Sequence, residues 1–151
     1  MRKELPCTCG SVEEMWEETA LLHSEELGDI VLHMDTVPVV DAMTGFPEEL
    51  HDGEEICVWL GDAVTLSFPP QTTPLLVAVN LPAEGARPQL HEIERVEGDT
   101  LLTTCGETLN VGPAAEIFPY RTRQIVTAAD LLPGTRILVW GEMERILVFG
   151  A

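Results

Sequence analysis

The chain has 151 residues, of which 45% are hydrophobic and 23% are charged, and it contains 11 prolines and 12 glycines. This composition is typical of a globular protein with a buried core, and it excludes a disordered or collagen-like chain. The formal net charge is −18 and Lys3 is the only lysine, which argues against binding to nucleic acid or to anionic membrane surfaces, because both attract Lys and Arg.

The charge is unevenly distributed along the chain. Residues 1–80 hold 2 basic and 16 acidic side chains, whereas residues 81–151 hold 6 basic and 10 acidic ones. The first part therefore either presents an acidic face to a basic partner or carries a solubilising surface.

The first residues and the cysteines bear on the compartment. Met1–Pro6 has a basic start without an apolar stretch behind it, and no apolar run reaches the length of a membrane span. We therefore expect a cytoplasmic protein. Its four cysteines are expected to be thiols outside any disulfide, since Cys7 and Cys9 are too close to crosslink the fold usefully; the others are Cys57 and Cys105.

The chain contains an internal repeat. Asp52–Trp59 and Pro133–Trp140 each have a turn glycine, two polar residues and an alternating strand that ends in Trp, 81 residues apart. Three further pairs match in the same order at an offset of 78 or 81: Val12–Glu14 with Ile93–Arg95, Gly28–Leu32 with Gly106–Asn110, and Val39–Val40 with Ile117–Phe118. The sequence thus predicts two copies, 1–80 and 81–151, as separate repeats or within one compact domain.

The start of each copy is predicted to be a β-hairpin. Apolar residues within 12–19 recur at helical spacing, so periodicity alone also permits a short helix. The equivalent stretch, Ile93–Thr103, contains a turn at Glu97-Gly98-Asp99 between two short apolar strands. The repeat therefore favours a hairpin over Val12–His23 that turns near Glu17-Glu18.

Each copy is predicted to continue through three more strands and a short edge segment, which makes five strands with the hairpin. The first copy has a third strand over Ile30–Met34, an edge segment over Val37–Val40, a strand that ends in Trp59 within Asp52–Trp59, and a closing strand over Leu75–Val79. In the second copy the corresponding segments are Thr108–Val111, Glu116–Phe118, the strand that ends in Trp140 within Pro133–Trp140, and Ile146–Phe149. Trp59 and Trp140, at equivalent strand ends, are expected in the core.

A single helical turn is predicted before the penultimate strand of each copy. In the second copy Thr127 offers an N-cap, Ala128–Leu132 form the turn and Pro133-Gly134 end it. The predicted fold class is all-β: two diverged copies of a small OB-like barrel unit packed together, each with one short helical turn.

The central connector of the chain, which precedes the closing strand of the first copy, contains adjacent prolines. Thr65–Pro74 includes Pro69 and Pro70, which lack backbone N–H donors and therefore exclude a central strand. The segment is expected to be a rigid rim or an exposed recognition segment, which makes Pro69, Pro70 and Gln71 candidate partner contacts.

Several of these segments resemble one bacterial module. The residues that carry the resemblance are Val39–Gly45, Asp52-Gly53 before a strand, Ser67–Gln71, Pro119–Thr122 and Asp130–Arg136. The module is often found upstream of copper amine oxidase N-terminal-like domains, and the resemblance extends over about Val12–Phe149. It implies an extracytoplasmic or envelope-associated accessory module of unknown function, and it supplies no catalytic residues. The export signal and the appended domain of such proteins are not seen in this sequence.

The sequence predicts neither catalytic residues nor a cofactor. Copper oxidase chemistry needs a tyrosine-derived quinone and a histidine cluster, whereas Tyr120 is the only tyrosine and the histidines are scattered. Cys7 and Cys9 are the candidate metal ligands, although a structural zinc site usually has two close pairs. Cys57 matches Leu138 in the other copy and is interpreted as a small strand residue. A Cys–His pair formed only in space stays open.

Three hypotheses on function follow. The first is a non-enzymatic β module that binds a protein partner or a second copy of itself, with Tyr120, Arg121 and Arg123 as further candidate contacts because the two arginines alternate on an extended segment. Those arginines could equally pair with the acidic first half. The second hypothesis is a metal- or small-ligand-binding protein that uses Cys7 and Cys9. The third is an enzyme with a site between the repeats.

Overall fold

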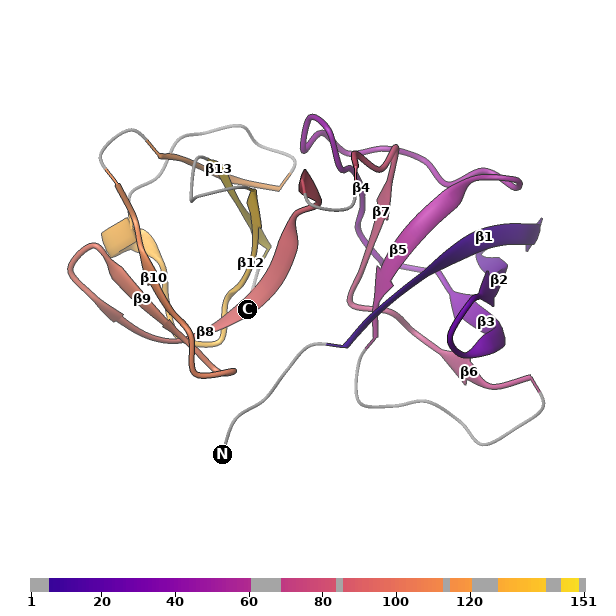
Figure 1. Ribbon diagram of the computed structural model, residues 1–151, viewed down its shortest axis with the longest axis horizontal. Coiled ribbons are helices and arrows are strands. Elements are labelled where there is room, and N and C mark those ends of the chain that lie inside the picture. The colour runs from indigo at the N-terminus through magenta and orange to yellow at the C-terminus, as the bar shows by residue number, and fades with distance from the viewer. Residues whose placement is uncertain are drawn as a thin grey trace. The chain divides into compact units, whose positions relative to one another are not determined.

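The computed structural model describes residues 6–60, 69–83, 86–112, 115–120, 128–140 and 145–149. The chain divides into two compact units, one comprising Pro6–Pro82 and the other containing Ala83–Ala151. Both units consist almost entirely of β-strands (Figure 1), so the predicted all-β class is confirmed.

The first unit is a seven-stranded sheet. Its strands in chain order are β1 (Cys7–Trp16), β2 (Thr19–Ser24), β3 (Gly28–His33), β4 (Val39–Asp41), β5 (Glu55–Trp59), β6 (Gln71–Thr72) and β7 (Leu76–Val79). Across the sheet they are ordered β4-β7-β5-β1-β2-β3-β6. The β4–β7 and β3–β6 pairs are parallel and the other pairs are antiparallel.

The second unit is a six-stranded sheet with one short 3₁₀ helix. It contains β8 (Gln89–Glu97), β9 (Thr100–Thr103), β10 (Thr108–Asn110), β11 (Glu116–Pro119), η2 (Ala128–Asp130), β12 (Arg136–Trp140) and β13 (Arg145–Phe149). The strand order is β10-β9-β8-β12-β13-β11, and only the β11–β13 pair among these described strands is parallel.

The two sheets share one topology. Without β6, the order of the first sheet matches that of the second, read from the opposite edge, strand for strand. Both long first strands carry a register irregularity at equivalent places, between Val12 and Glu14 and between Ile93 and Arg95. The repeat in the sequence therefore corresponds to a repeat of strand topology.

Both predicted hairpins are present. β1 and β2 are joined at Glu17-Glu18, where Glu17 adopts a positive φ of 50°, and β8 and β9 are joined at Gly98-Asp99, where Gly98 has a φ of 62°. Left-handed backbone at these positions fits tight turns between antiparallel strands. The alternative short helix over residues 12–19 is wrong, because Val12, Met15 and their neighbours pair with β2.

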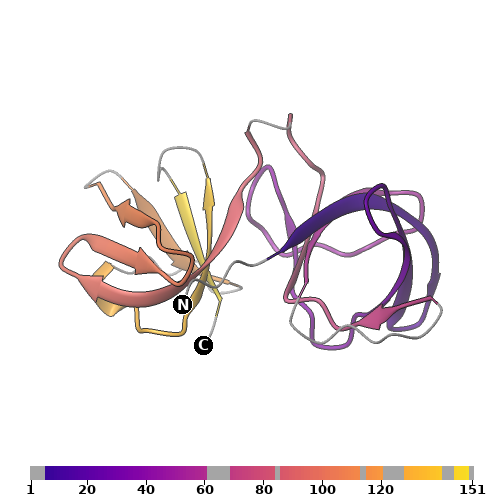
Figure 2. The same cartoon turned by 60° about the horizontal axis from the view of Figure 1, so that its bottom comes forward.

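The sequence predicts a barrel unit that is closed or partly open, and the described strands do not form a closed one. No pairing among them joins the outer strands of either sheet, which are β4 and β6 in one and β10 and β11 in the other. Curvature is nevertheless strong, as the long arc of β1 in Figure 2 shows.

The predicted helical turn is found in one copy only. η2 spans Ala128–Asp130, whereas its proposed N-cap, Thr127, lies outside the described residues. In the first copy, residues 42–54 are all described and contain turns but no helix. There the Asp41 carboxylate accepts hydrogen bonds from the backbone N–H groups of Met43 and Thr44, at 2.7 and 3.1 Å. These bonds form a local side-chain turn directly after β4, whereas η2 lies directly before β12 in the second copy.

The proline segment ends in an edge strand. Residues 61–68 lie outside the described part, but Gln71–Thr72 form β6, which pairs with β3. The Val31 N–H donates to the Pro70 carbonyl oxygen at 2.9 Å. A proline at the border of an edge strand costs no hydrogen bond of a central ladder, so the exclusion of a central strand holds.

Each unit has its own hydrophobic cluster. In the first, Leu22, Leu32 and Ile56 have no exposed surface; in the second, Leu101, Ile137 and Ile146 have none. Trp59 and Trp140 are buried, as predicted. No helix in the described part of the chain has the length and apolar character needed to cross a membrane.

Candidate functional site

Three cysteine sulfurs gather on one face of the first sheet. Cys7 and Cys9 are two residues apart on β1, and alternate residues of a strand point to the same face. Cys57 on β5 is directly opposite Cys9 in the antiparallel register. The three Sγ atoms consequently lie within 4.8 Å of one another. We call Cys7, Cys9 and Cys57 the cysteine cluster.

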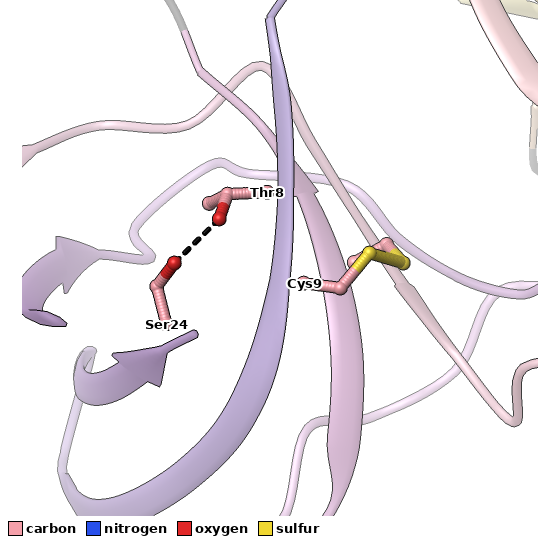
Figure 3. Close-up of a disulfide and its surroundings, with 4 residues drawn as sticks. Thr8, Cys9 and Ser24 are labelled. Atoms are coloured by element: carbon pink, nitrogen blue, oxygen red, sulfur yellow. Dashed lines mark hydrogen bonds between the residues drawn. A yellow bond between two sulfur atoms is a disulfide. The ribbon is translucent and has the colours of Figure 1, made fainter. Parts of the chain in front are cut away.

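Two members of the cysteine cluster form a disulfide. The Sγ atoms of Cys9 and Cys57 are 2.07 Å apart, and Figure 3 shows the bond beside β1. The expectation that all four cysteines are thiols outside any disulfide is therefore wrong for this pair, while Cys7 and Cys105 are thiols. The separation of 48 residues hides the pairing in the sequence, because only the β1–β5 register brings the two Cα atoms to 4.1 Å.

The two faces of β1 differ at this point. Cys7 is exposed, Cys9 is half-buried and Cys57 is buried. The intervening Thr8 points to the other side (Figure 3), where its hydroxyl and that of Ser24 form a buried hydrogen bond of 2.5 Å. The sulfur atoms are thus concentrated on one face and are reachable from solvent at Cys7.

The cysteine cluster has two chemical states. As a disulfide, Cys9 and Cys57 cannot supply thiolates. After reduction, the cluster offers three sulfur ligands, and thiolates select soft ions such as Zn²⁺ and Cu⁺. The sequence-based candidates Cys7 and Cys9 are therefore brought together, and Cys57 was missed as the third member. Nothing in the sequence marked Cys57, because its pairing with Cys9 follows from strand register; the counterparts 81 residues on, Leu90 and Leu138, form the same cross-strand pair.

A second cluster lies in the second unit and is formed by His91, Cys105 and Glu107. His91 Nδ1 lies 4.0 Å from Cys105 Sγ, and His91 Nε2 lies 3.8 Å from Glu107 Oε2. His91 is on β8, whereas Cys105 and Glu107 belong to the turn between β9 and β10. We call these three residues the histidine cluster; the sequence left such a Cys–His pair open without locating it.

Burial governs the charge of this histidine. His91 is only 8% exposed. Burial lowers the pKa of His91, and the nearby Glu107 carboxylate opposes this effect without reversing it. The imidazole is therefore neutral near pH 7, with one ring nitrogen able to accept a proton.

A third group of ligand side chains is fully exposed. His23 Nδ1 is 2.8 Å from Asp29 Oδ1 and 3.9 Å from Glu13 Oε1. The hydrogen bond to Asp29 raises the pKa of His23. This arrangement is a surface ion pair, and such pairs contribute little to stability.

The candidate partner contacts fall in different units. Tyr120, in the second unit, packs its ring against Phe149 with centroids 5.2 Å apart. In the first unit Pro69 is exposed, Pro70 and Gln71 are half-buried, and the Gln71 side chain is hydrogen-bonded to His33 Nε2 at 2.9 Å. Arg121 and Arg123 lie outside the described residues.

Comparison with known proteins gives no relative in which these two clusters could be examined. The chain matches no protein-family model, no curated protein and no solved structure.

Proposed function

We propose that the reduced protein binds one thiophilic metal ion, Zn²⁺ or Cu⁺, through the thiolates of Cys7, Cys9 and Cys57. The observation that carries this proposal is the convergence of three sulfur atoms within 4.8 Å on neighbouring strands. The disulfide joins two of these sulfurs. The third, that of Cys7, has no part in the crosslink and adds a third ligand beside the pair.

The distances suit a thiolate site. A Zn–S bond is about 2.3 Å, so sulfurs around one ion are about 3.8–4.0 Å apart. The Cys7 sulfur lies within 4.8 Å of the other two, and Cys9 and Cys57 can separate to the required distance once their bond is broken. The strands need not move, because β1 and β5 hold the cysteine backbones in register.

The surroundings favour a cation that can be exchanged. Three protein ligands leave at least one coordination position open, in contrast to closed four-ligand structural sites. The exposed Cys7 side supplies access from solvent, and the formal charge of −18 attracts cations. These features support a site that takes up and releases an ion.

Metal binding is coupled to thiol oxidation in this proposal. Reduction of the Cys9–Cys57 bond by two small thiols yields two cysteine thiols and one small disulfide, with two electrons and two protons transferred to the protein. Metal binding then displaces the thiol protons. Oxidation reverses the sequence, since a sulfur in a disulfide no longer offers a thiolate.

The test measures metal uptake by each redox form. Protein purified without a metal-affinity tag is reduced with a phosphine and titrated with Zn²⁺, and separately with Co²⁺ to observe sulfur-to-cobalt charge-transfer bands; Cu⁺ is offered in competition with a copper chelator. We expect one ion per reduced chain and none per oxidised chain.

Matched variants locate the site. Cys7→Ser and Cys57→Ser should each lose the charge-transfer bands, whereas Cys105→Ser should retain them because Cys105 belongs to the second unit. Uptake well below one equivalent by the reduced protein, or uptake unchanged in Cys7→Ser, would refute the proposal.

Binding to a protein partner or to a second copy stays a prediction from the sequence, as does the resemblance to the accessory module. We put the metal site before it because three ligand sulfurs converge among the described residues, whereas the candidate contacts Arg121 and Arg123 lie outside them.

A further inference from the structure

We infer that Cys105 is a nucleophilic thiol and that His91 is the base that accepts its proton. We also infer that Cys105 is a site of S-thiolation by small disulfides. This inference concerns the second unit and is independent of the cysteine cluster.

The order of the three groups carries the inference. Cys105 Sγ faces Nδ1 of the imidazole, at 4.0 Å, while Glu107 Oε2 faces Nε2, at 3.8 Å. The nucleophile, Cys105, and the group that orients the base, Glu107, thus lie at opposite ring nitrogens of the base, His91. Metal ligation is the rival role for these residues, because one ligand atom of each lies within 4.8 Å of the others, and the zinc arm of the experiment below separates the two roles. Distances between such groups are often longer in a protein without its substrate.

The burial of His91 makes it a competent base. Its lowered pKa keeps the imidazole neutral near pH 7. The Glu107 carboxylate, on the solvent side of the cluster, favours the tautomer with the proton on Nε2. The lone pair of Nδ1 is then directed at the thiol and can accept its proton.

Thr103 fixes the turn that carries the thiol. Its hydroxyl donates to the Glu107 carbonyl oxygen at 3.0 Å and accepts from the Glu107 N–H at 3.1 Å. The same hydroxyl oxygen lies 3.1 Å from Cys105 Sγ. Thr103, which is itself buried, therefore positions Cys105 and Glu107 together in front of His91.

Comparison with the first unit shows how the cluster arises. At the offset of 81 residues, His91 and Cys105 correspond to Gly10 and Ser24, which face each other across β1 and β2. A Cβ atom at Gly10 would collide with the backbone carbonyl group of His23, so that position excludes a side chain. In the second unit β9 ends at Thr103, before the equivalent of Ser24, and an imidazole is accommodated at residue 91.

The reaction that we propose is a thiol–disulfide exchange. His91 Nδ1 takes the proton of Cys105, and the thiolate attacks one sulfur of a small disulfide R–S–S–R. The bond between the two small-molecule sulfurs breaks as the Cys105–S–S–R bond forms, and the leaving thiolate takes the proton back from His91. Cys105 is oxidised and half of the small disulfide is reduced, so no other reactant is needed. The half-buried thiol remains accessible to a small reagent.

The experiment measures modification of each cysteine separately. Protein is incubated with oxidised glutathione between pH 5 and 9, quenched with acid, and mapped by peptide mass spectrometry. The mixed disulfide at Cys105 should form at pH 7 at least ten-fold faster than in His91→Gln, and the rate in that variant should rise more steeply with pH. The exposed Cys7 in the same molecule is the internal reference, and its rate should not change.

A second variant guards against misfolding, because His91 is buried and Glu107 is exposed. Glu107→Gln should slow the modification of Cys105 by a smaller factor while leaving the far-ultraviolet spectrum unchanged. Equal Cys105 rates and equal pH profiles in the wild type and both variants would overturn the inference. Protection of Cys105 by one equivalent of Zn²⁺, in a Cys7→Ser background, would also overturn it and would identify a metal site instead.

Discussion

Cys9 on β1 and Cys57 on β5 are directly opposite each other, and their sulfur atoms are joined across the two strands. In the second unit the corresponding positions are Leu90 and Leu138, which are also directly opposite. One copy of the repeat thus has a covalent link where the other has an apolar pair, and a redox-dependent stability is expected in the first unit alone.

Reduction of this disulfide should destabilise the first unit. The bond joins residues separated by 48 positions, and a crosslink of this span lowers the entropy of the unfolded chain by an amount worth about 4 kcal/mol at 25 °C. Urea unfolding with and without a phosphine reductant measures the difference. The Cys9→Ala/Cys57→Ala double variant is the control, and its unfolding should not respond to reductant. An unchanged midpoint in the reduced wild type would contradict the prediction.

The effect of a metal ion on the thermal melt should depend on the redox state of the protein. A ligand at 100 times its Kd adds about 2.7 kcal/mol, which raises Tm by roughly 5–10 °C in a chain of this size. We expect such a rise with Zn²⁺ in the reduced protein, and none with Ca²⁺, because thiolates are poor ligands for hard cations. The oxidised protein should melt at one temperature in all conditions. A zinc-induced rise of equal size in Cys7→Ser would argue against the cysteine cluster.

Gly10 should tolerate no side chain. The backbone of the neighbouring strand approaches Gly10 so closely that an added Cβ would lie 2.8 Å from the His23 carbonyl carbon and 2.9 Å from the Ser24 Cα. A clash with backbone rather than with a flexible side chain forces the strands apart. Gly10→Ala is therefore expected to lower the free energy of unfolding by about 2–4 kcal/mol. Gly112→Ala is the matched control, because nothing lies within 4 Å of the place that its Cβ would take and its φ is not positive. Urea unfolding of both variants checks the contrast.

The positions of most strands along the chain were predicted from the sequence, but their order across the sheets was not. Alternating residues and turn glycines located the strands, and the Ile93–Thr103 hairpin decided the structure of residues 12–23. The sequence left a closed and a partly open barrel as alternatives, because closure depends on pairing between outer strands that share no sequence pattern. The first copy has no helical turn at residues 47–49, which are equivalent to η2 at the offset of 81, although the repeat predicted a turn before that strand.

The two candidate sites differ in how far the sequence reaches them. Cys9 and Cys57 are 48 residues apart and meet through the register of β1 with β5, which a repeat alignment does not reveal. His91 and Cys105 lie on either side of the predicted Ile93–Thr103 hairpin, so their approach follows from that hairpin, but no spacing pattern marks them as a site. The cysteine cluster was therefore half predicted, through Cys7 and Cys9, and the histidine cluster was anticipated only as an unlocated Cys–His pair.

Two histidines should titrate on opposite sides of the ordinary value of 6.5. Burial lowers the pKa of His91, and the hydrogen bond to Asp29 raises that of His23. For His91 the unfolded chain binds the proton more tightly than the folded chain does. Its stabilising contribution is consequently complete above pH 6.5 and is lost as the pH falls below 6.5 towards the folded pKa. Proton NMR titration of the imidazole signals gives both values, and His91→Gln should weaken the loss of stability between pH 6.5 and 5. A higher pKa for His91 than for His23 would contradict this assignment.

The Asp41 carboxylate should contribute far more to the free energy of unfolding of the first unit than the carboxylates on the surface do. Its Oδ1 accepts the two backbone N–H groups of Met43 and Thr44, and its Oδ2 accepts the Asn80 amide at 2.9 Å. The residue is only 9% exposed, so its removal leaves donors without a partner in a site that water reaches poorly. We expect Asp41→Ala to lower the free energy of unfolding by about 2–4 kcal/mol, because hydrogen bonds to charged groups are the stronger ones.

Asp29→Ala is the matched control for Asp41, since it removes a carboxylate whose side chain is 50% exposed and which is hydrogen-bonded to the exposed His23. Its effect on urea unfolding should stay below about 0.5 kcal/mol. Asp41→Asn separates charge from geometry, because the amide oxygen can still accept one or both backbone donors while the bond to Asn80 is weakened. A loss in Asp41→Ala no larger than that in Asp29→Ala would mean that the turn after β4 is stable without the Asp41 carboxylate.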